Sequence, residues 1–141
     1  MKKQLTIYLI TFLIASLFVP QQTKAQSPPQ KMSYQAVIRD SNNALITSTM
    51  VGMQISILQS SSTGTVVYKE TQTPTSNVNG LVSIEIGAGT VISGTFSAID
   101  WANGPFYIKT DTDPAGGTNY TISGTSELLP VPYAFHAKTA E

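Results

Sequence analysis

Two carboxylates at the start of a glycine-rich turn are the first residues that could do chemistry. Asp111 and Asp113 stand two residues apart, and Gly116 and Gly117 follow them. Carboxylate oxygens in a loop can bind a hard cation such as calcium, and Asp100 could add a third ligand if the fold brought it close. The segment lacks the further acidic ligands of an EF-hand loop, and aspartate commonly caps turns through backbone N–H groups. A structural turn is therefore favoured, with calcium as the alternative cofactor.

Catalytic residues are scarce in the rest of the chain. His136 is the only histidine and there is no cysteine, so a Ser-His-Asp site would depend on one side chain near the C-terminus, where nothing is expected to orient it. Gly87-Ala88-Gly89 resembles part of a dinucleotide-binding loop, but no helical pattern follows it, so we interpret it as a turn after a strand. We expect no enzyme and no other cofactor.

Aromatic side chains offer a different chemistry, the stacking of a sugar ring. Four of them could form such a platform: Trp101, Tyr107, Tyr120 and Tyr133. Aromatic residues of small β-sandwiches more often fill the core. Tyr107 is the best surface candidate because it alternates out of phase with Phe106 and Ile108. Tyr107 and Trp101 are accordingly the candidate ligand-binding residues, and glycans the candidate ligands.

The first 25 residues have the layout of a secretory signal peptide. Lys2 and Lys3 precede an apolar run over residues 5–19, which at about 15 residues is shorter than the ~20 that span a bilayer. Thr23 and Ala25 suit the pocket of signal peptidase, so we expect cleavage after Ala25. The mature chain would be secreted to the exterior or the outer cell surface, with the periplasm as the alternative, and no later stretch is long enough to span a membrane.

The mature chain has the two-residue period of β-strands. Residues 26–31 read as a flexible leader, and residues 32–130 as one all-β domain, an antiparallel β-sandwich. Strands are expected at 33–39, 51–59, 65–72, 81–86, 105–111 and 120–128, separated by clusters of Gly, Pro, Asn and Asp. A single helical turn over residues 96–101, capped by Thr95, would close one end of the core.

The C-terminal segment differs from the strands before it. Residues 131–141 are rich in alanine, so we expect a short helix-prone connector through which the chain associates with itself or with a protein partner. The first 25 residues hold three lysines and no acid, which leaves the mature chain mildly acidic. Nucleic acid is therefore not an expected partner, because phosphate binding depends on clustered Lys and Arg.

Several motifs resemble a known family, and they occur in that family's order. They are Met32–Asp40, Gly64–Thr71, Asn79–Gly87, Asp113–Tyr120 and Val131–Ala134. The chain resembles the N-terminal module of secreted and surface proteins of Gram-negative bacteria, which often carry collagen-like, coiled-coil or tail-fibre-like segments downstream. The resemblance implies an immunoglobulin-like or transthyretin-like sandwich. It also implies a structural or adhesive role at the cell surface, with a carbohydrate-binding module, assisted by calcium, as the alternative.

Overall fold

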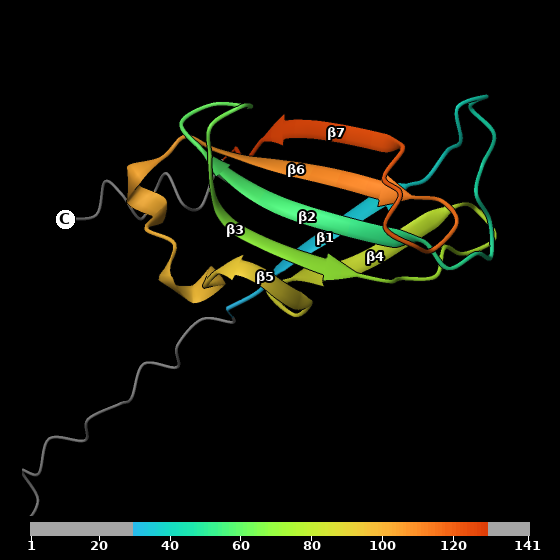
Figure 1. The fold of residues 1–141 in the computed structure, drawn as a ribbon, viewed down its shortest axis with the longest axis horizontal. Helices are drawn as coiled ribbons and strands as arrows, with labels where there is room; N and C mark the ends of the chain where they lie inside the picture. The colour runs from blue at the N-terminus through green and yellow to red at the C-terminus, as the bar shows by residue number, and fades with distance from the viewer. Residues whose placement is uncertain (1–29, 130–141) are drawn as a thin grey trace, which may run out of the picture.

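The structure is a computed structural model, and it describes residues 30–129. These residues form strands and short 3-10 helices with no α-helix among them (Figure 1). The elements, in chain order, are β1 (Met32–Val37), β2 (Gly52–Gln59), β3 (Thr65–Gln72), β4 (Leu81–Ile86), β5 (Thr90–Gly94), η2 (Phe96–Ala98), η3 (Trp101–Asn103), β6 (Phe106–Asp113) and β7 (Ile122–Glu127).

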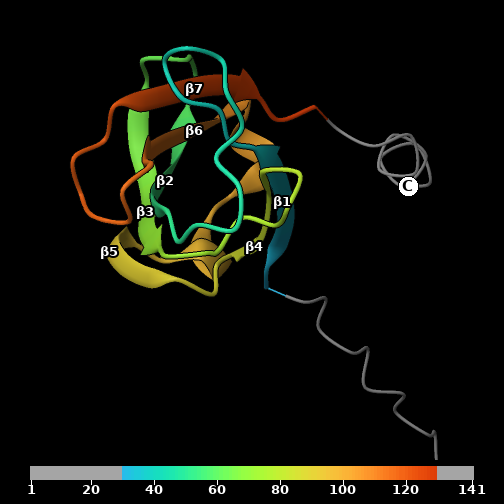
Figure 2. The ribbon, with the colours of Figure 1, turned by 90° about the vertical axis from the view of Figure 1, so that its right-hand side faces the viewer.

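The strands make two antiparallel sheets of unequal size. The larger sheet has the order β5-β3-β2-β6-β7, and the smaller one pairs β1 with β4. Figure 2 shows β1 and β4 on one side of the molecule, with β2 and β3 across from them. This arrangement confirms the predicted all-β sandwich. It also leaves β5 and β7 as the two outer strands of the larger sheet.

The core lies between the two sheets and is built by alternate residues of their strands. Its buried apolar members are Ile38, Val51, Met53, Ile55, Ile57, Tyr68, Val82, Ile84, Ile86, Phe106 and Ile108. In β4 the alternation is complete, because Ser83 and Glu85 are exposed between buried neighbours. In β2 it is not, since Ser56 and Leu58 on the opposite face are also buried. β2 is the central strand of the larger sheet. The side chains of the flanking strands β3 and β6 therefore shield Ser56 and Leu58 from solvent on the outer face.

All six predicted strands are present, with boundaries that agree to within two residues. The prediction missed β5, whose five residues are all exposed and whose apolar residues, Val91 and Ile92, are adjacent rather than alternating. The predicted turn over residues 96–101 is instead two 3-10 helices. The side chain of Thr95 makes no capping hydrogen bond to η2, whereas Asp100 caps η3 by accepting from the Ala102 N–H. The capping prediction for Thr95 was therefore wrong.

Several predictions lie outside the described residues. They concern the signal peptide over residues 1–25, most of the leader, the connector over residues 131–141, and the side chains of Tyr133 and His136. Within residues 30–129, no helix is long and apolar enough to cross a bilayer.

Candidate functional site

The two aspartates of the proposed calcium site are both engaged by protein donors. Asp111 accepts a hydrogen bond from the Ser123 hydroxyl and forms an ion pair with Lys109, with Nζ and Oδ2 3.0 Å apart. Asp113 accepts from the backbone N–H groups of Ala115 and Asn119, each at 2.9 Å. These bonds tie β6 to β7 and fix the turn after β6. Asp113 thus bonds to backbone N–H groups of the turn, as aspartates in turns commonly do, whereas Asp111 links neighbouring strands through side chains.

The third proposed ligand, Asp100, lies at the other end of β6. Its carboxylate accepts from the Ala102 N–H and from the Asn103 side chain, at 3.2 and 2.7 Å. β6 begins at Phe106, close to this helical turn, and ends at Asp113, so the length of the strand separates Asp100 from the other two carboxylates. Among residues 30–129, no three acidic or histidine side chains are grouped as a metal site.

The two proposed aromatic ligands lie on opposite faces of the larger sheet. Trp101 packs edge-on against Phe96 and Phe106, with ring centroids 5.7 and 5.0 Å apart. Phe106 points into the sandwich, so its neighbour Tyr107 points to the outer face, where it pairs across strands with Leu58. Tyr107 and Trp101 therefore do not form one platform. Trp101 keeps 46% of its surface exposed and is the more accessible of the pair to a ring-shaped ligand.

A surface pocket of about 380 Å³ lies between the 3-10 helices and the nearby ends of β2 and β6, and Trp101 is not among its lining residues. Its lining residues are Gln59, Val67, Thr95, Ala98, Ile99, Asp100, Asn103 and Phe106. Gln59 and Asp100 both bond to Asn103, which fixes the polar wall. The remaining oxygens of this wall are acceptors, and no basic side chain lines the pocket. It therefore suits ligands that donate hydrogen bonds, such as sugar hydroxyls.

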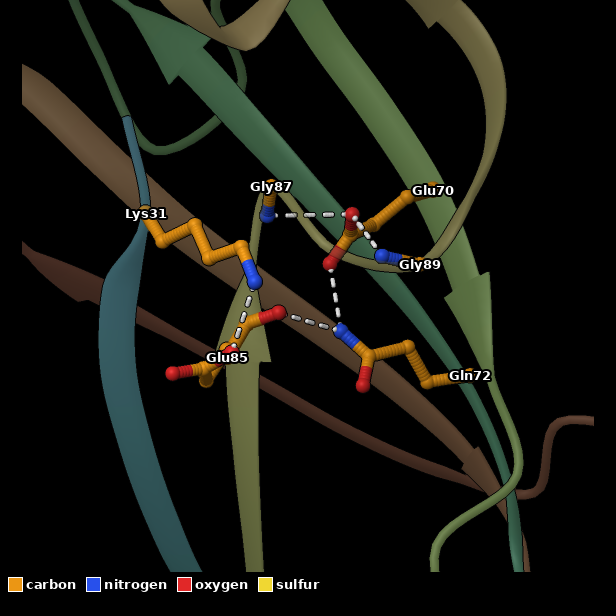
Figure 3. Close-up of polar contacts among 6 residues, drawn as sticks. All are labelled: Lys31, Glu70, Gln72, Glu85, Gly87 and Gly89. Atoms are coloured by element: carbon orange, nitrogen blue, oxygen red, sulfur yellow. Dashed lines mark hydrogen bonds and ion pairs between the residues drawn. The ribbon is translucent and has the colours of Figure 1, made fainter. Parts of the chain in front are cut away.

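The most extensively bonded acid of the described residues was missed by the sequence interpretation. Glu70 of β3 is fully buried, and its carboxylate accepts four hydrogen bonds. Two come from the side chains of Tyr68 and Gln72, at 2.6 and 2.7 Å. The other two come from the backbone N–H groups of Gly87 and Gly89, at 3.1 and 2.9 Å (Figure 3). The glycine turn that resembles a dinucleotide-binding loop thus binds an anion, and that anion is the protein's own side chain.

The contacts of Glu70 connect β3 to the turn between β4 and β5. Gln72 extends the link, because its amide also donates to the backbone carbonyl of Glu85 at 2.8 Å (Figure 3). Gly87 has a φ of 95°, and a Cβ at Gly89 would lie 2.7 Å from the Thr71 carbonyl oxygen, so both positions require glycine. The cluster holds the entry to β5 in one conformation.

Tyr68 is affected by its place in this cluster. Burial is the main cause that raises the pKa of its hydroxyl well above the usual value, and the hydrogen bond and negative charge of Glu70 raise it further. The hydroxyl therefore stays a donor to Glu70. The signal that could have revealed the cluster is periodicity, since Tyr68, Glu70 and Gln72 share the inward face of β3.

The region of the chain that matches a known protein family has nearly the same boundaries as the sandwich. The family described as "Domain of unknown function (DUF8740)" matches residues 33–130, well over half of the chain. The chain belongs to this family. The DUF8740 match begins within β1 and ends after β7, so it coincides with the sandwich. Searches of the curated proteins and of the solved structures found no match.

Proposed function

We propose that the chain is a secreted, non-catalytic structural or adhesive module of an extracellular or cell-surface assembly. The signal-peptide layout of residues 1–25 supports secretion. The sequence resemblance to N-terminal modules of surface proteins supports the assembly role. The buried acids favour a scaffold, since Glu70, Asp111 and Asp113 each use their oxygens to bind protein donors that fix turns and strands.

The observation that carries the proposal is the pair of open edges of the larger sheet. Among the strands of residues 30–129, β5 pairs only with β3, and β7 pairs only with β6. An open edge presents backbone N–H and C=O groups that can pair with another strand, which is a common mode of protein recognition. The module would therefore bind its neighbours in the assembly by strand addition, and the segment after β7 would contribute further contacts.

The experiment is the mass in solution of residues 26–141, measured by light scattering beside a chain that ends at Leu129. A dimer or trimer of the longer chain is the expected result, with a smaller species when residues 130–141 are removed. If both chains were monomers at high concentration, the assembly role would lose its support. Circular dichroism of the shorter chain controls for loss of the fold.

A second candidate function is carbohydrate binding, and two observations favour it: the exposed ring of Trp101 and the pocket lined by Gln59, Asp100 and Asn103. An exposed aromatic ring offers an apolar face, and a few fixed polar groups in a pocket can orient a ligand. Glycan-array binding by residues 26–141, measured with and without calcium and lost in Trp101→Ala, would support it. Tyr107→Ala, on the opposite face, is the matched control and should leave binding unchanged. A silent array would dismiss this candidate.

A further inference from the structure

The surface pocket lies at the end of the sandwich where β2 ends and β6 begins (Figure 1). Of the residues that line it, Asp100 alone is charged. Asp100 is also the only charged residue between Glu85 and Lys109 in the sequence. The wall of the pocket therefore carries one negative charge that no neighbour along the chain offsets.

The carboxylate of Asp100 is exposed and keeps room for a ligand. A carboxylate can accept about four hydrogen bonds. Two of these positions are used, by the Ala102 N–H and by the side chain of Asn103. Within residues 30–129, no lysine or arginine forms an ion pair with Asp100, in contrast to Asp111 on β6. A cationic ligand could therefore bind here without displacing a cation of the protein.

The other polar groups of the wall add further acceptors. The NH2 group of Gln59 donates to the backbone carbonyl of Asn103 at 2.8 Å, and the NH2 group of Asn103 donates to Asp100 at 2.7 Å. The side-chain oxygens of Gln59 and Asn103 accept no hydrogen bond within residues 30–129. A ligand with several donors thus matches this wall better than a ligand rich in acceptors.

The remainder of the lining is largely apolar. Its apolar members are Val67, Ala98, Ile99 and Phe106. Apolar walls with a few fixed polar groups are typical of small-ligand sites, and a volume of about 380 Å³ lies in their usual range. A sugar ring suits such a site, because its C–H groups can contact the apolar wall while its hydroxyls donate to the amide oxygens.

We infer that this pocket binds a sugar that carries a protonated amino group, with the ammonium at Asp100 and the hydroxyls at Gln59 and Asn103. An ammonium supplies three donors and a positive charge, which match the unused acceptor positions of the carboxylate. A simple alkylammonium, such as a lysine side chain, has the charge but lacks hydroxyls for the two amides. This inference rests on the carbohydrate-binding candidate and names the substrate class of that pocket.

Three monosaccharides that differ in one group test the inference: glucosamine, N-acetylglucosamine and glucose. Each is titrated into 15N-labelled residues 26–141 at a pH that keeps the amine protonated. The side-chain NH2 signals of Gln59 and Asn103 report binding by NMR. Glucosamine should bind about fivefold more tightly than the two neutral sugars, as expected for an ion pair at the surface. High salt should reduce this preference, because it screens the charges.

Asp100→Asn should abolish the preference for glucosamine without disrupting the turn. Its side-chain oxygen can still accept from the Ala102 N–H, and the Asn103 amide can turn so that its oxygen accepts from the new NH2 group. Glu85→Gln is the matched control. It removes the same charge from an exposed acid that does not line the pocket, so the preference should be unchanged.

The outcomes separate this inference from the function on which it rests. If the three sugars bound equally well at these amides, the inference would be overturned and the carbohydrate-binding candidate would stand. If no sugar shifted the signals, both would fail. Butylamine binding as tightly as glucosamine would identify an alkylammonium site and overturn the inference, as would a preference that persisted in Asp100→Asn.

Discussion

Replacing Glu70 with glutamine should destabilise the fold more than its conservative size suggests. A glutamine can keep its oxygen where it accepts from Tyr68, Gly87 and Gly89, but its NH2 group then faces the NH2 group of Gln72. Turning the Gln72 amide does not resolve this conflict, because its oxygen would then face the carbonyl of Glu85. One polar contact of the partly buried Gln72 amide is lost in either arrangement.

The magnitude follows from what is lost. Loss of a hydrogen bond to a charged acceptor costs about 1.5–3 kcal/mol. Glu70→Ala leaves four donors without an acceptor and opens a cavity, so about 4–5 kcal/mol is expected. With an m-value of about 1.5 kcal/mol per molar urea, Glu70→Gln should lower the unfolding midpoint by about 1.5 M.

The assay is urea unfolding of residues 26–141, followed by the fluorescence of Trp101, the single tryptophan. Glu85→Gln is the matched control, since it makes the same change at an exposed acid whose partner is Lys31 at 2.9 Å. That ion pair lies at the surface, so the control should change the free energy of unfolding by less than about 0.5 kcal/mol. Equal midpoints for the two glutamine variants would refute the role assigned to Glu70.

Three further predictions concern other parts of the chain. Between pH 8 and pH 11, Tyr68 should lower the free energy of unfolding of the parent chain by about 1.4 kcal/mol, and Tyr68→Phe should abolish this decrease. Urea unfolding at both pH values measures it. The raised pKa keeps the folded hydroxyl protonated while the unfolded one ionises above about pH 10, so this stability is present below that pH and lost above it. If Tyr68→Phe lost as much stability between the two pH values as the parent chain, the loss could not be assigned to Tyr68. Gly52→Ala should cost more than about 2 kcal/mol, because the new Cβ would lie 1.9 Å from the Gly117 carbonyl oxygen. Gly124→Ala, whose Cβ would meet only the Thr110 hydroxyl at 3.7 Å, should stay within about 1 kcal/mol of the parent. Mass spectrometry of protein exported by a Gram-negative host should give a chain that begins at Gln26, and retention of residues 1–25 would contradict cleavage.

The fold class could be predicted because alternation is a local property of the sequence. Val82, Ile84 and Ile86 alternate with polar residues, and the structure places them in the core with Ser83 and Glu85 outside. The burial of Ser56 could not be predicted in this way, since it results from the position of β2 between β3 and β6. Which strand becomes central depends on pairings between segments that are distant in the chain.

The candidate sites were harder to predict than the strands. Asp111 and Asp113 have the spacing of cation ligands, but their bonding is decided by Ser123, Lys109 and the turn after β6. Trp101 and Tyr107 are six residues apart in the sequence, and only the direction of β6 shows that they face opposite ways. Such relations are set by tertiary packing, which the spacing of residues does not contain.

Two features were missed because each depends on a partner that is remote in sequence. Glu70 alternates in phase with the buried Tyr68, but the backbone donors that satisfy its carboxylate, at Gly87 and Gly89, are remote in the sequence. β5 lacks alternation because it lies at the edge of the sheet and contains a register shift opposite Lys69 and Glu70. A glycine turn followed by an uncharged β-branched pair is the sequence signal that could have indicated an edge strand.

The central claim is that this module associates through an open sheet edge, and hydrogen exchange of residues 26–141 tests it most directly. The exchange rates of the amides in β5 and β7 are compared at low and high protein concentration. The account predicts that protection of at least one outer strand, β5 (Thr90–Gly94) or β7 (Ile122–Glu127), rises with concentration. Equal exchange of both strands at the two concentrations, in a chain that nonetheless associates, would contradict the claim.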